Sequence, residues 1–202
     1  GIEGAEVIVV DNDSTDDTAD VARKAGASVI QEAQRGYGAA VRAGLKKATG
    51  GVIAIIDGDG QHPSFELIHA AKLVAGDFDF VTCVRTPSRF LGSHSFRNFG
   101  NRLLTGYIRL IFNVSIGDSQ SGMVVFKREI LEKIYPANIG FEVAQELKIR
   151  AATDSTISYG EYPIKFKGRS HGFSKLKPIR NGLKNMVHAT MLRFGPKAID
   201  RR

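Results

Sequence analysis

The hydrophobic and polar positions in the first third of the chain alternate between two periods. Short apolar runs, which we predict to be strands, occupy 6–10, 27–31, 52–56 and 78–84. Helices are predicted between them at about 15–25, with Ser14 or Thr15 as the cap, and at 38–48 and 64–75. This alternation favours an α/β fold with a mostly parallel central sheet flanked by helices. The run 52–56 is apolar throughout, which predicts a central strand.

After residue 84 the pattern becomes mainly helical. Helical spacing of apolar residues is found at 96–114, 128–134, 141–152 and 179–194, and strand-like runs at 123–126 and 156–166. The helices 96–114 and 179–194 carry apolar stripes with basic residues among them, namely Arg102, Arg109, Lys184 and Arg193. Such helices are suited to a bilayer surface. The alternative is that both stripes pack against the sheet as core.

Charge divides the chain into two halves. Residues 1–79 carry 7 basic and 13 acidic residues, whereas residues 80–202 carry 21 basic and 8 acidic ones. An acidic half suits a metal site and a basic half suits phosphate groups, although a basic surface can also be merely solvated. The basic residues follow no nucleic-acid-binding motif, so a nucleic-acid partner is not expected.

Cysteine content and apolar run length exclude other classes. The single cysteine, Cys83, excludes a disulfide framework and is expected to be buried in a reducing compartment. The longest apolar run is 52–56, too short to cross a bilayer. The chain opens at Gly1 without a signal-peptide core, and we expect a cytoplasmic location.

The sharpest chemical signal is the motif DGDGQHP at 57–63, directly after the predicted buried strand. Asp57 and Asp59 end a strand of an α/β sheet, where ligands bind. Hard divalent cations prefer such oxygen ligands, and Mg²⁺ shares its shell with substrate phosphates. An EF-hand is excluded because a strand precedes the motif and residue 68 is Ile. The alternative is an ordinary Asp/Gly turn.

Weaker signals precede and follow this motif. VDNDSTDDT at 10–18 places Asp11 at another strand end, although helix capping alone accounts for 14–17. RGYGAAV at 35–41 is not a dinucleotide fingerprint, because residue 41 is Val. Its glycines, Gly36 and Gly38, predict a tight helix entry with close backbone approach to a ligand.

Two later segments are further candidates. DSQSG at 118–122 is a candidate functional motif or simply a polar loop before a strand. RSHGFSK at 169–175 places Arg169 and Lys175 on a Gly/Ser loop that can close over phosphate oxygens, or is merely a solvated basic loop. The histidines, His62 among them, have no metal-ligand spacing and are predicted to be structural or at the surface.

Taken in order, these motifs resemble a known family. The series VVDNDSTDDT, RGYGAAVRAGLKKATG, VIAIIDGDGQHP, DSQSGMVVFKREIL and GRSHGFSKL resembles the inverting family 2 glycosyltransferases. It is most similar to the dolichyl- or polyprenyl-phosphate mannosyl- and glucosyltransferases, over about residues 5–176. The resemblance implies a GT-A fold in a single catalytic domain over 1–202. Its nucleotide and metal half would be about 1–84, and its acceptor and phosphate half about 85–202.

The resemblance also implies roles for individual residues. It implies Asp11 as a nucleotide ligand, Asp57, Asp59 and Gln61 as ligands of Mg²⁺ or Mn²⁺, Asp118 on the acceptor side, and Arg85, Arg97, Arg169 and Lys175 as phosphate-binding cations. The sequence departs from the family at three places. The resemblance implies that a first βα unit is absent, which predicts a gap in the sheet beside 6–10. Asn12-Asp13 replaces the commoner Asp-Gly pair, and Met123 begins a segment in which an acceptor-side Arg is usual.

The function that this resemblance implies is metal-dependent transfer of a hexose. The donor would be a nucleotide-sugar of the GDP-mannose or UDP-glucose type, and the acceptor a polyprenyl or dolichyl phosphate. The protein would lie peripherally on the cytoplasmic membrane face. Two alternatives remain open. One is a glycosyltransferase with a soluble or polysaccharide hydroxyl acceptor, which the absence of Trp makes less favourable. The other is a truncated, non-catalytic nucleotide-sugar binding module.

Overall fold

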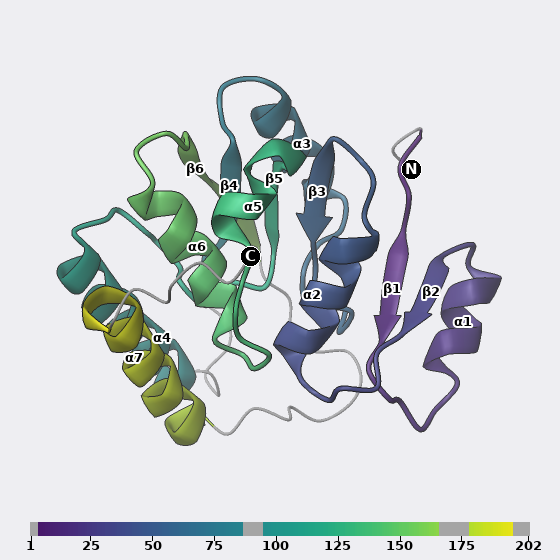
Figure 1. The fold of residues 1–202 in the computed structure, drawn as a ribbon, viewed down its shortest axis with the longest axis horizontal. Coiled ribbons are helices and arrows are strands. Elements are labelled where there is room, and N and C mark those ends of the chain that lie inside the picture. Colours follow the sequence, from purple (N-terminus) through teal and green to yellow (C-terminus); the bar gives the residue numbers. More distant parts are fainter. Residues whose placement is uncertain (1–3, 87–94, 166–177, 196–202) are drawn as a thin grey trace.

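The computed structural model describes residues 4–86, 95–165 and 178–195, which form an α/β fold (Figure 1). The strands are β1 (Ile8–Asp11), β2 (Ser28–Gln31), β3 (Val52–Ile55), β4 (Phe80–Thr86), β5 (Val124–Lys127) and β6 (Tyr159–Lys165). The helices are α1 (Thr18–Lys24), α2 (Tyr37–Lys47), α3 (Glu66–Ala75), α4 (Ser95–Phe112), α5 (Leu131–Ile134), α6 (Val143–Thr153) and α7 (Pro178–Phe194), with a 3₁₀ turn, η2 (Arg128–Ile130). The predicted order of strands and helices is therefore confirmed.

The strands form two separate groups. β3, β5, β4 and β6 make a four-stranded sheet in that order, in which β5 runs antiparallel to β3 and β4 while β4 and β6 are parallel. β1 and β2 pair in parallel as a second, two-stranded sheet. Within the described residues, β5 is therefore the strand that departs from the mostly parallel arrangement.

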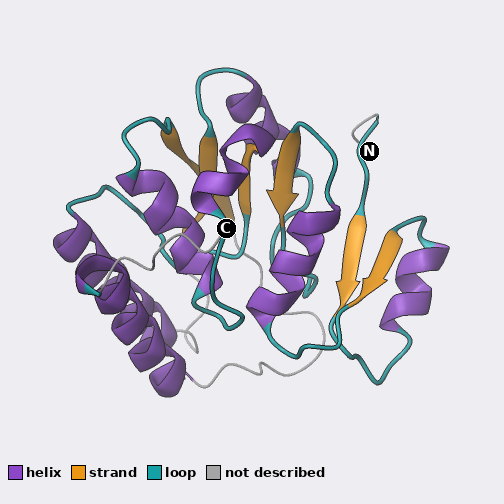
Figure 2. Ribbon diagram, viewed as in Figure 1, coloured by secondary structure: helices purple, strands orange, loops and turns teal. Residues whose placement is uncertain are grey.

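A gap in hydrogen bonding separates β1 from β3, as predicted. Figure 2 shows β1 and β2 set apart from the other four strands, with α2 lying between the two groups. The prediction that 52–56 forms a central strand is wrong for the described chain, because β3 is an edge strand with Val52 and Ala54 exposed. The reason is that β3 has a neighbour, β5, on one side only.

The four-stranded sheet separates two apolar clusters. Phe80 pairs across the strands with Phe126, and both side chains enter the cluster covered by α2, α5 and α6. The next residues, Val81 and Val125, also pair, and they enter the cluster under α3. Successive strand residues point to opposite faces, so this alternation in β4 and β5 fixes both layers of the core.

Helix α1 begins later than the sequence predicted. Its N-terminal cap position is Asp17, not Ser14 or Thr15. The Ser14 backbone N–H instead donates to Asp11 Oδ1 at 3.1 Å, which forms a turn after β1. A side chain that caps its own turn competes with helix capping, which accounts for the late start.

Helices α4 and α7 pack side by side and form a third apolar cluster. Leu104, Ile108 and Ala189 are buried in it, and the Tyr107 and Thr190 hydroxyls lie 2.6 Å apart across the two helices. Among the described helices, none combines the length and the apolar character that a bilayer crossing requires.

Candidate functional site

The loop after β3 brings the predicted metal acids into a compact turn. The backbone N–H of Gln61 donates to Asp59 Oδ1 at 3.0 Å, and Gln61 and His62 are both buried. Asp57 Oδ2 lies 3.8 Å from His62 Nδ1. His62, which the sequence left as a structural or surface residue, therefore lies inside the candidate site against Asp57.

Asp57 fits a cation ligand. Its Oδ1 is buried and accepts no hydrogen bond by distance and angle from the residues that the structure describes. A buried carboxylate oxygen without a donor is costly, and a bound cation would relieve that cost. Among the described residues, no group of three or more His, Cys, Asp or Glu side chains is placed so that it could hold a metal ion by itself. Asp57 and Asp59 could thus hold an ion only together with phosphate and water, which is the usual arrangement for Mg²⁺.

Tyr37 is a site residue that sequence reasoning missed. Burial raises its pKa well above the usual range, and the charge of Asp57, its hydrogen bond with Asp57 and the charge of Asp59 act in the same direction. Burial lowers the pKa of His62 more than the charge of Asp57 raises it. Near neutral pH both rings are therefore uncharged beside the two acids.

Asp11 and Asn12 connect β1 to the start of α2. Asp11 is buried, and its Oδ2 accepts from Gln31 Nε2 at 3.0 Å. Asn12 Nδ2 donates to the backbone oxygens of Glu32 and Gln34, while Asn12 Oδ1 accepts from the backbone N–H of Gly36, each at 2.8 Å. Since Tyr37 follows Gly36 and reaches Asp57, these contacts link the Asp11 turn with the Asp57 loop.

The close approach at Gly36 and Gly38 is to the chain itself. Gly36 has a φ of +149°, and a Cβ there would overlap the carbonyl oxygen of Ile139. A Cβ on Gly38 would overlap Ile139 and Val143. The predicted tight entry into α2 is therefore confirmed, and the close contact that these glycines allow in this structure is with the backbone before α6.

Arg85 and Asp118 form a buried, two-pronged ion pair. Arg85 Nε donates to Asp118 Oδ2 at 2.6 Å, and Arg85 Nη2 donates to Asp118 Oδ1 at 2.8 Å. Their side chains are 17% and 10% exposed. Burial raises the pKa of Asp118, but the hydrogen bonds and charge of Arg85, together with the charge of Lys148, outweigh it and hold the pKa below the ordinary value. Asp118 is thus an anion that is already neutralised.

Segment 117–122 is held from several sides. Glu161 Oε1 accepts from the Gly117 backbone N–H at 2.6 Å, and Ser121 Oγ donates to the Cys83 carbonyl at 2.6 Å. Lys148, which sequence reasoning also missed, is completely buried beneath this segment. A Cβ on Gly122 would overlap the carboxylate of Asp57, so the segment forms one wall of the Asp57 site.

Three predicted phosphate-binding cations cannot be placed. Arg97 lies in α4, and its side chain is outside the described residues. Arg169 and Lys175 lie outside the described residues altogether. The structure therefore brings together Asp57, Asp59, Gln61, Arg85 and Asp118, with Asp11 linked to them through Asn12 and Gly36.

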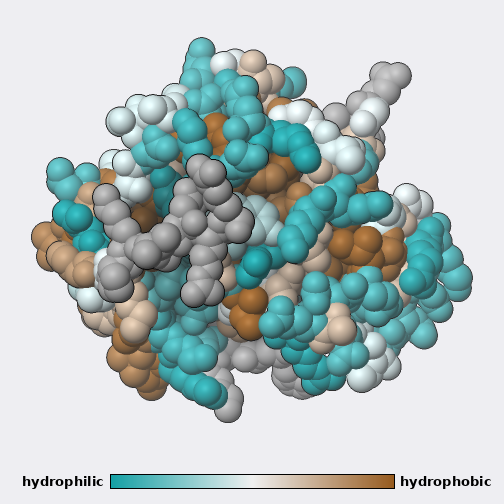
Figure 3. Space-filling view, in the orientation of Figure 1, coloured by the Kyte–Doolittle hydropathy of each residue, from teal (hydrophilic) through white to brown (hydrophobic). Residues whose placement is uncertain are grey.

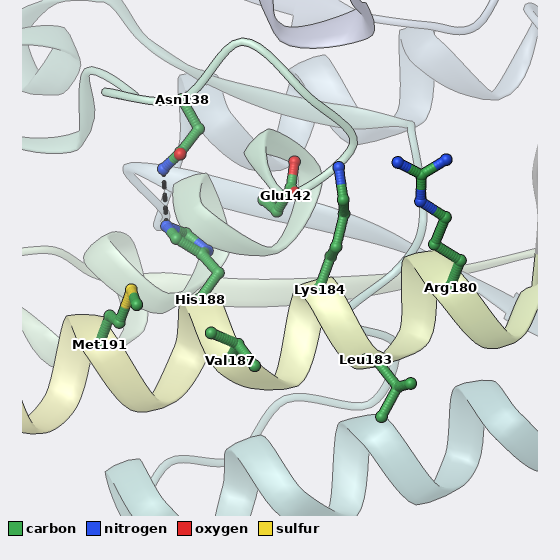
Figure 4. A pocket seen from close by; sticks show the side chains of 8 residues that line it. All are labelled: Asn138, Glu142, Arg180, Leu183, Lys184, Val187, His188 and Met191. Carbon is green, nitrogen blue, oxygen red and sulfur yellow. Dashed lines mark hydrogen bonds between the residues drawn. The ribbon is translucent and has the colours of Figure 1, made fainter.

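A groove of about 440 Å³ lies between α7 and the segment before α6, away from Asp57 and Asp59. Figure 4 shows Arg180 and Lys184 extending from α7 toward the segment that carries Glu142. Two of its lining residues are joined, since Asn138 Nδ2 and His188 Nε2 lie 2.7 Å apart. Apolar side chains of α7, among them Val187, complete the lining.

Comparison with known proteins identifies the family. The family model described as "Glycosyl transferase family 2" matches residues 2–135. The chain belongs to this family. It is 31% identical over 179 residues to a dolichyl-phosphate hexose transferase of Haloferax volcanii, covering 88% of this chain and 76% of that protein. It is also 31% identical over 185 residues to the low-salt glycan biosynthesis hexosyltransferase Agl6 of the same organism, covering 90% of this chain and 44% of that protein.

Solved structures share the fold. Glucosyl-3-phosphoglycerate synthase from Mycobacterium tuberculosis, in complex with Mn²⁺, uridine diphosphate and glucosyl-3-phosphoglycerate, aligns with a TM-score of 0.69 and 23% identity. The alignment covers 96% of this chain and 70% of that one. At this identity the likeness shows the GT-A fold, which confirms the predicted fold class.

Proposed function

We propose that this chain transfers a hexose from a nucleotide-diphosphate sugar to the phosphate of a polyprenyl or dolichyl lipid, with inversion at the anomeric carbon. The family, the acidic loop after β3 and the relative named as a dolichyl-phosphate hexose transferase support this proposal. A second relative, 26% identical and from Pyrococcus furiosus, is named dolichol-phosphate mannosyltransferase. The chain spans only 44% of the length of the Agl6 relative. The donor and the acceptor are therefore part of the proposal.

The Arg85–Asp118 pair is the observation that favours a phosphate acceptor over a hydroxyl acceptor. A hydroxyl acceptor needs a general base, and an effective base has a pKa near the working pH. Asp118 has a lowered pKa and both oxygens bound to Arg85, which makes it a poor base. A phosphate acceptor is already anionic and needs cations to approach the anionic donor. Arg85 is already paired with Asp118, so we infer that Arg97, Arg169 and Lys175 supply these cations.

The proposed donor site uses the acids at the strand ends. Asp57 and Asp59 would hold a divalent cation, Mg²⁺ or Mn²⁺, with Gln61 beside them, and Asp11 would contact the nucleoside. The solved relative binds Mn²⁺ and uridine diphosphate. When bound, the ion supplies positive charge to the diphosphate leaving group.

The chemical step is a single displacement. An oxygen of the acceptor phosphate forms a bond to the anomeric carbon while the bond from that carbon to the donor diphosphate breaks, so the configuration inverts. The task of the protein is to align two anions, because positioning is the main entropic cost of such a step. Segment 117–122 and the Asp57 loop form the adjoining walls between which this alignment takes place.

The outer faces of α4 and α7 support a lipid acceptor. Large apolar side chains are exposed on α4 (Phe99, Leu103 and Leu110) and on α7 (Ile179, Leu183, Val187, Met191 and Phe194). Figure 3 shows brown, apolar surface over α7. Contiguous exposed apolar surface marks a protein or membrane contact. Arg180 and Lys184 on α7 could pair with anionic headgroups, so we propose peripheral binding at the cytoplasmic membrane face.

The test is a transfer assay with radiolabelled GDP-mannose and UDP-glucose. Polyprenyl phosphate in detergent is compared with phosphoglycerate, which offers a hydroxyl, each with Mn²⁺ or with a chelator. We expect metal-dependent transfer to the lipid phosphate. Asp59→Asn should lower turnover by at least about a hundred-fold, since it removes an anionic metal ligand. Asp77→Asn, an exposed acid before β4, is the matched control and should be unchanged.

Two results would contradict the proposal. Transfer to the hydroxyl of phosphoglycerate but not to the lipid phosphate would show that the acceptor is a hydroxyl group. Unchanged turnover of Asp59→Asn would remove the metal assignment.

A further inference from the structure

Lys148 is a charged side chain in a completely buried position, where proteins ordinarily have apolar residues. It lies in the middle of α6 and is 0% exposed, among the largest completely buried side chains of the described chain. Burying an ammonium group is costly unless it is hydrogen-bonded and its charge is balanced. An apolar residue at this position would avoid that cost, so the contacts of Lys148 indicate what the charge does.

The Lys148 ammonium has one acceptor for each of its protons. Nζ donates to the carbonyl oxygens of Ser119 at 3.1 Å, Ser121 at 2.5 Å and Ala144 at 2.9 Å. An ammonium group has three donors and no acceptor, which matches three carbonyls. A neutral amine has two donors and would turn its lone pair toward the third oxygen. The arrangement therefore selects the charged form.

Lys148 lies among charged groups of both signs. The carboxylates of Asp118 and Asp57 are close enough to stabilise its charge, and Arg85 opposes it. Although burial lowers its pKa to about 8, the group remains mostly protonated at neutral pH.

Two of the three carbonyls belong to the segment that forms the wall of the site. Asp118, which pairs with Arg85, precedes Ser119, and Gly122, which adjoins the Asp57 carboxylate, follows Ser121. A shift of this backbone would change both the Arg85–Asp118 pair and the space beside Asp57. Lys148 holds the two carbonyls between those points.

We propose that Lys148 is a positioning residue of the transfer site: its ammonium group fixes the backbone of 119–121 against Asp57. The proposal rests on the proposed function, because it assigns a role to a residue behind the same site. It assigns Lys148 no contact with donor or acceptor.

The first experiment compares Lys148→Met with Lys127→Met. Methionine has nearly the length of lysine without charge or donors. Lys127 pairs with Asp79 at 2.8 Å at the other end of the sheet, so its replacement also removes a lysine–aspartate ion pair. We expect Lys148→Met to lower kcat per folded molecule by at least about ten-fold with a smaller change in KM for the donor, because the charge and the wall act on the aligned reactants. Lys127→Met should keep the wild-type kcat.

A purely structural role predicts a different result. Lys148→Met would then lower the melting temperature while leaving kcat per folded molecule within about two-fold of wild type, which would overturn the proposal.

The second measurement uses the wild-type protein and does not depend on how any variant folds. In uniformly ¹³C,¹⁵N-labelled protein, the Lys148 ammonium should give a slowly exchanging signal with couplings to the carbonyl carbons of 119, 121 and 144. A Lys148 signal that exchanges as fast as surface lysines would overturn the proposal. If the wild type shows no transfer at all, the proposed function fails, and this measurement still decides whether the ammonium holds the segment.

Discussion

At the scale of single residues, the site is built from charges that are neutralised within the protein. Arg85 and Asp118 are joined by two short hydrogen bonds and are both largely buried. Breaking such a pair from one side leaves the other charge buried and unpaired, which costs more than the pair itself contributes. Replacing either residue alone is therefore expected to destabilise the folded protein.

We predict that Asp118→Asn lowers the free energy of unfolding by about 3 kcal/mol or more at neutral pH, measured by urea denaturation. The matched control is Asp13→Asn. Asp13 forms an ion pair with Arg35 whose side chains are 54% and 72% exposed, and its loss should cost less than about 1 kcal/mol. Equal losses in the two variants would contradict a buried pair.

The same variant carries a pH prediction. The pKa of Asp118 is lower in the folded than in the unfolded state, so its contribution is present above the unfolded pKa and is lost as the pH falls through the folded one. The stability difference between wild type and Asp118→Asn should stay constant from pH 7 to about 5 and shrink below about pH 4. A difference that already shrinks between pH 7 and 5 would show that another group is responsible.

At the scale of elements, α7 has two faces with different tasks. Its inner face contributes Ala189 and Asn185 to the interior, and Asn185 Nδ2 donates to Gln120 Oε1 at 2.7 Å. Its outer face exposes a stripe that includes Leu183 and Val187. A helix whose inner face already packs has no need of a second apolar face for folding, so the outer stripe requires another explanation.

We predict that Leu183→Glu combined with Val187→Glu weakens binding to anionic lipid vesicles by at least about ten-fold, measured by flotation, because both side chains would otherwise enter the acyl region. Val21→Glu on α1 is the control, because Val21 is also an exposed valine on a helix, and binding should be unchanged. Raising the salt concentration should weaken binding of all forms through Arg180 and Lys184. If the wild type binds vesicles at neither low nor high salt, the membrane part of the proposed function fails.

At the scale of the whole molecule, the two sheets differ in how deeply their elements are buried. α1 has no buried residue, and β2 is exposed at both ends. In contrast, β4 pairs on both sides and is completely buried from Phe80 to Cys83. Local opening follows the density of buried contacts, so the two parts are expected to open at different free energies.

Hydrogen exchange tests this difference. Amides of β1 and β2 should exchange at least about ten-fold faster than those of β4 and β5, followed by mass spectrometry of peptides from each strand. β6, an edge strand of the four-stranded sheet, is the internal control and should be intermediate. Equal protection of β1 and β4 would show that the two sheets open as one unit.

The sequence by itself determined which elements form and where the acidic loop lies. Period-two and helical spacing are local properties of the chain, and they predicted nearly every described strand and helix in order. Asp57, Asp59 and Gln61 are close in the sequence, so their meeting in one turn could be predicted. Asp11 could be predicted as a candidate site residue, because it ends a strand and helix capping does not account for it.

Only the tertiary structure decided how distant segments complete the site. Arg85 and Asp118 are 33 residues apart, and Lys148 reaches the carbonyl of Ser119 across 29. The periodicity of α6 indicated a helix but did not reveal that Lys148 is buried in it, because a polar residue in a periodic pattern is ordinarily solvated. The gap beside β3 made an apolar run into an edge strand, and the backbone at Ile139 filled the space beside Gly36. The physical reason is the same in each case: local pattern fixes the direction of a side chain within its own element, whereas burial and pairing depend on which other element packs against it.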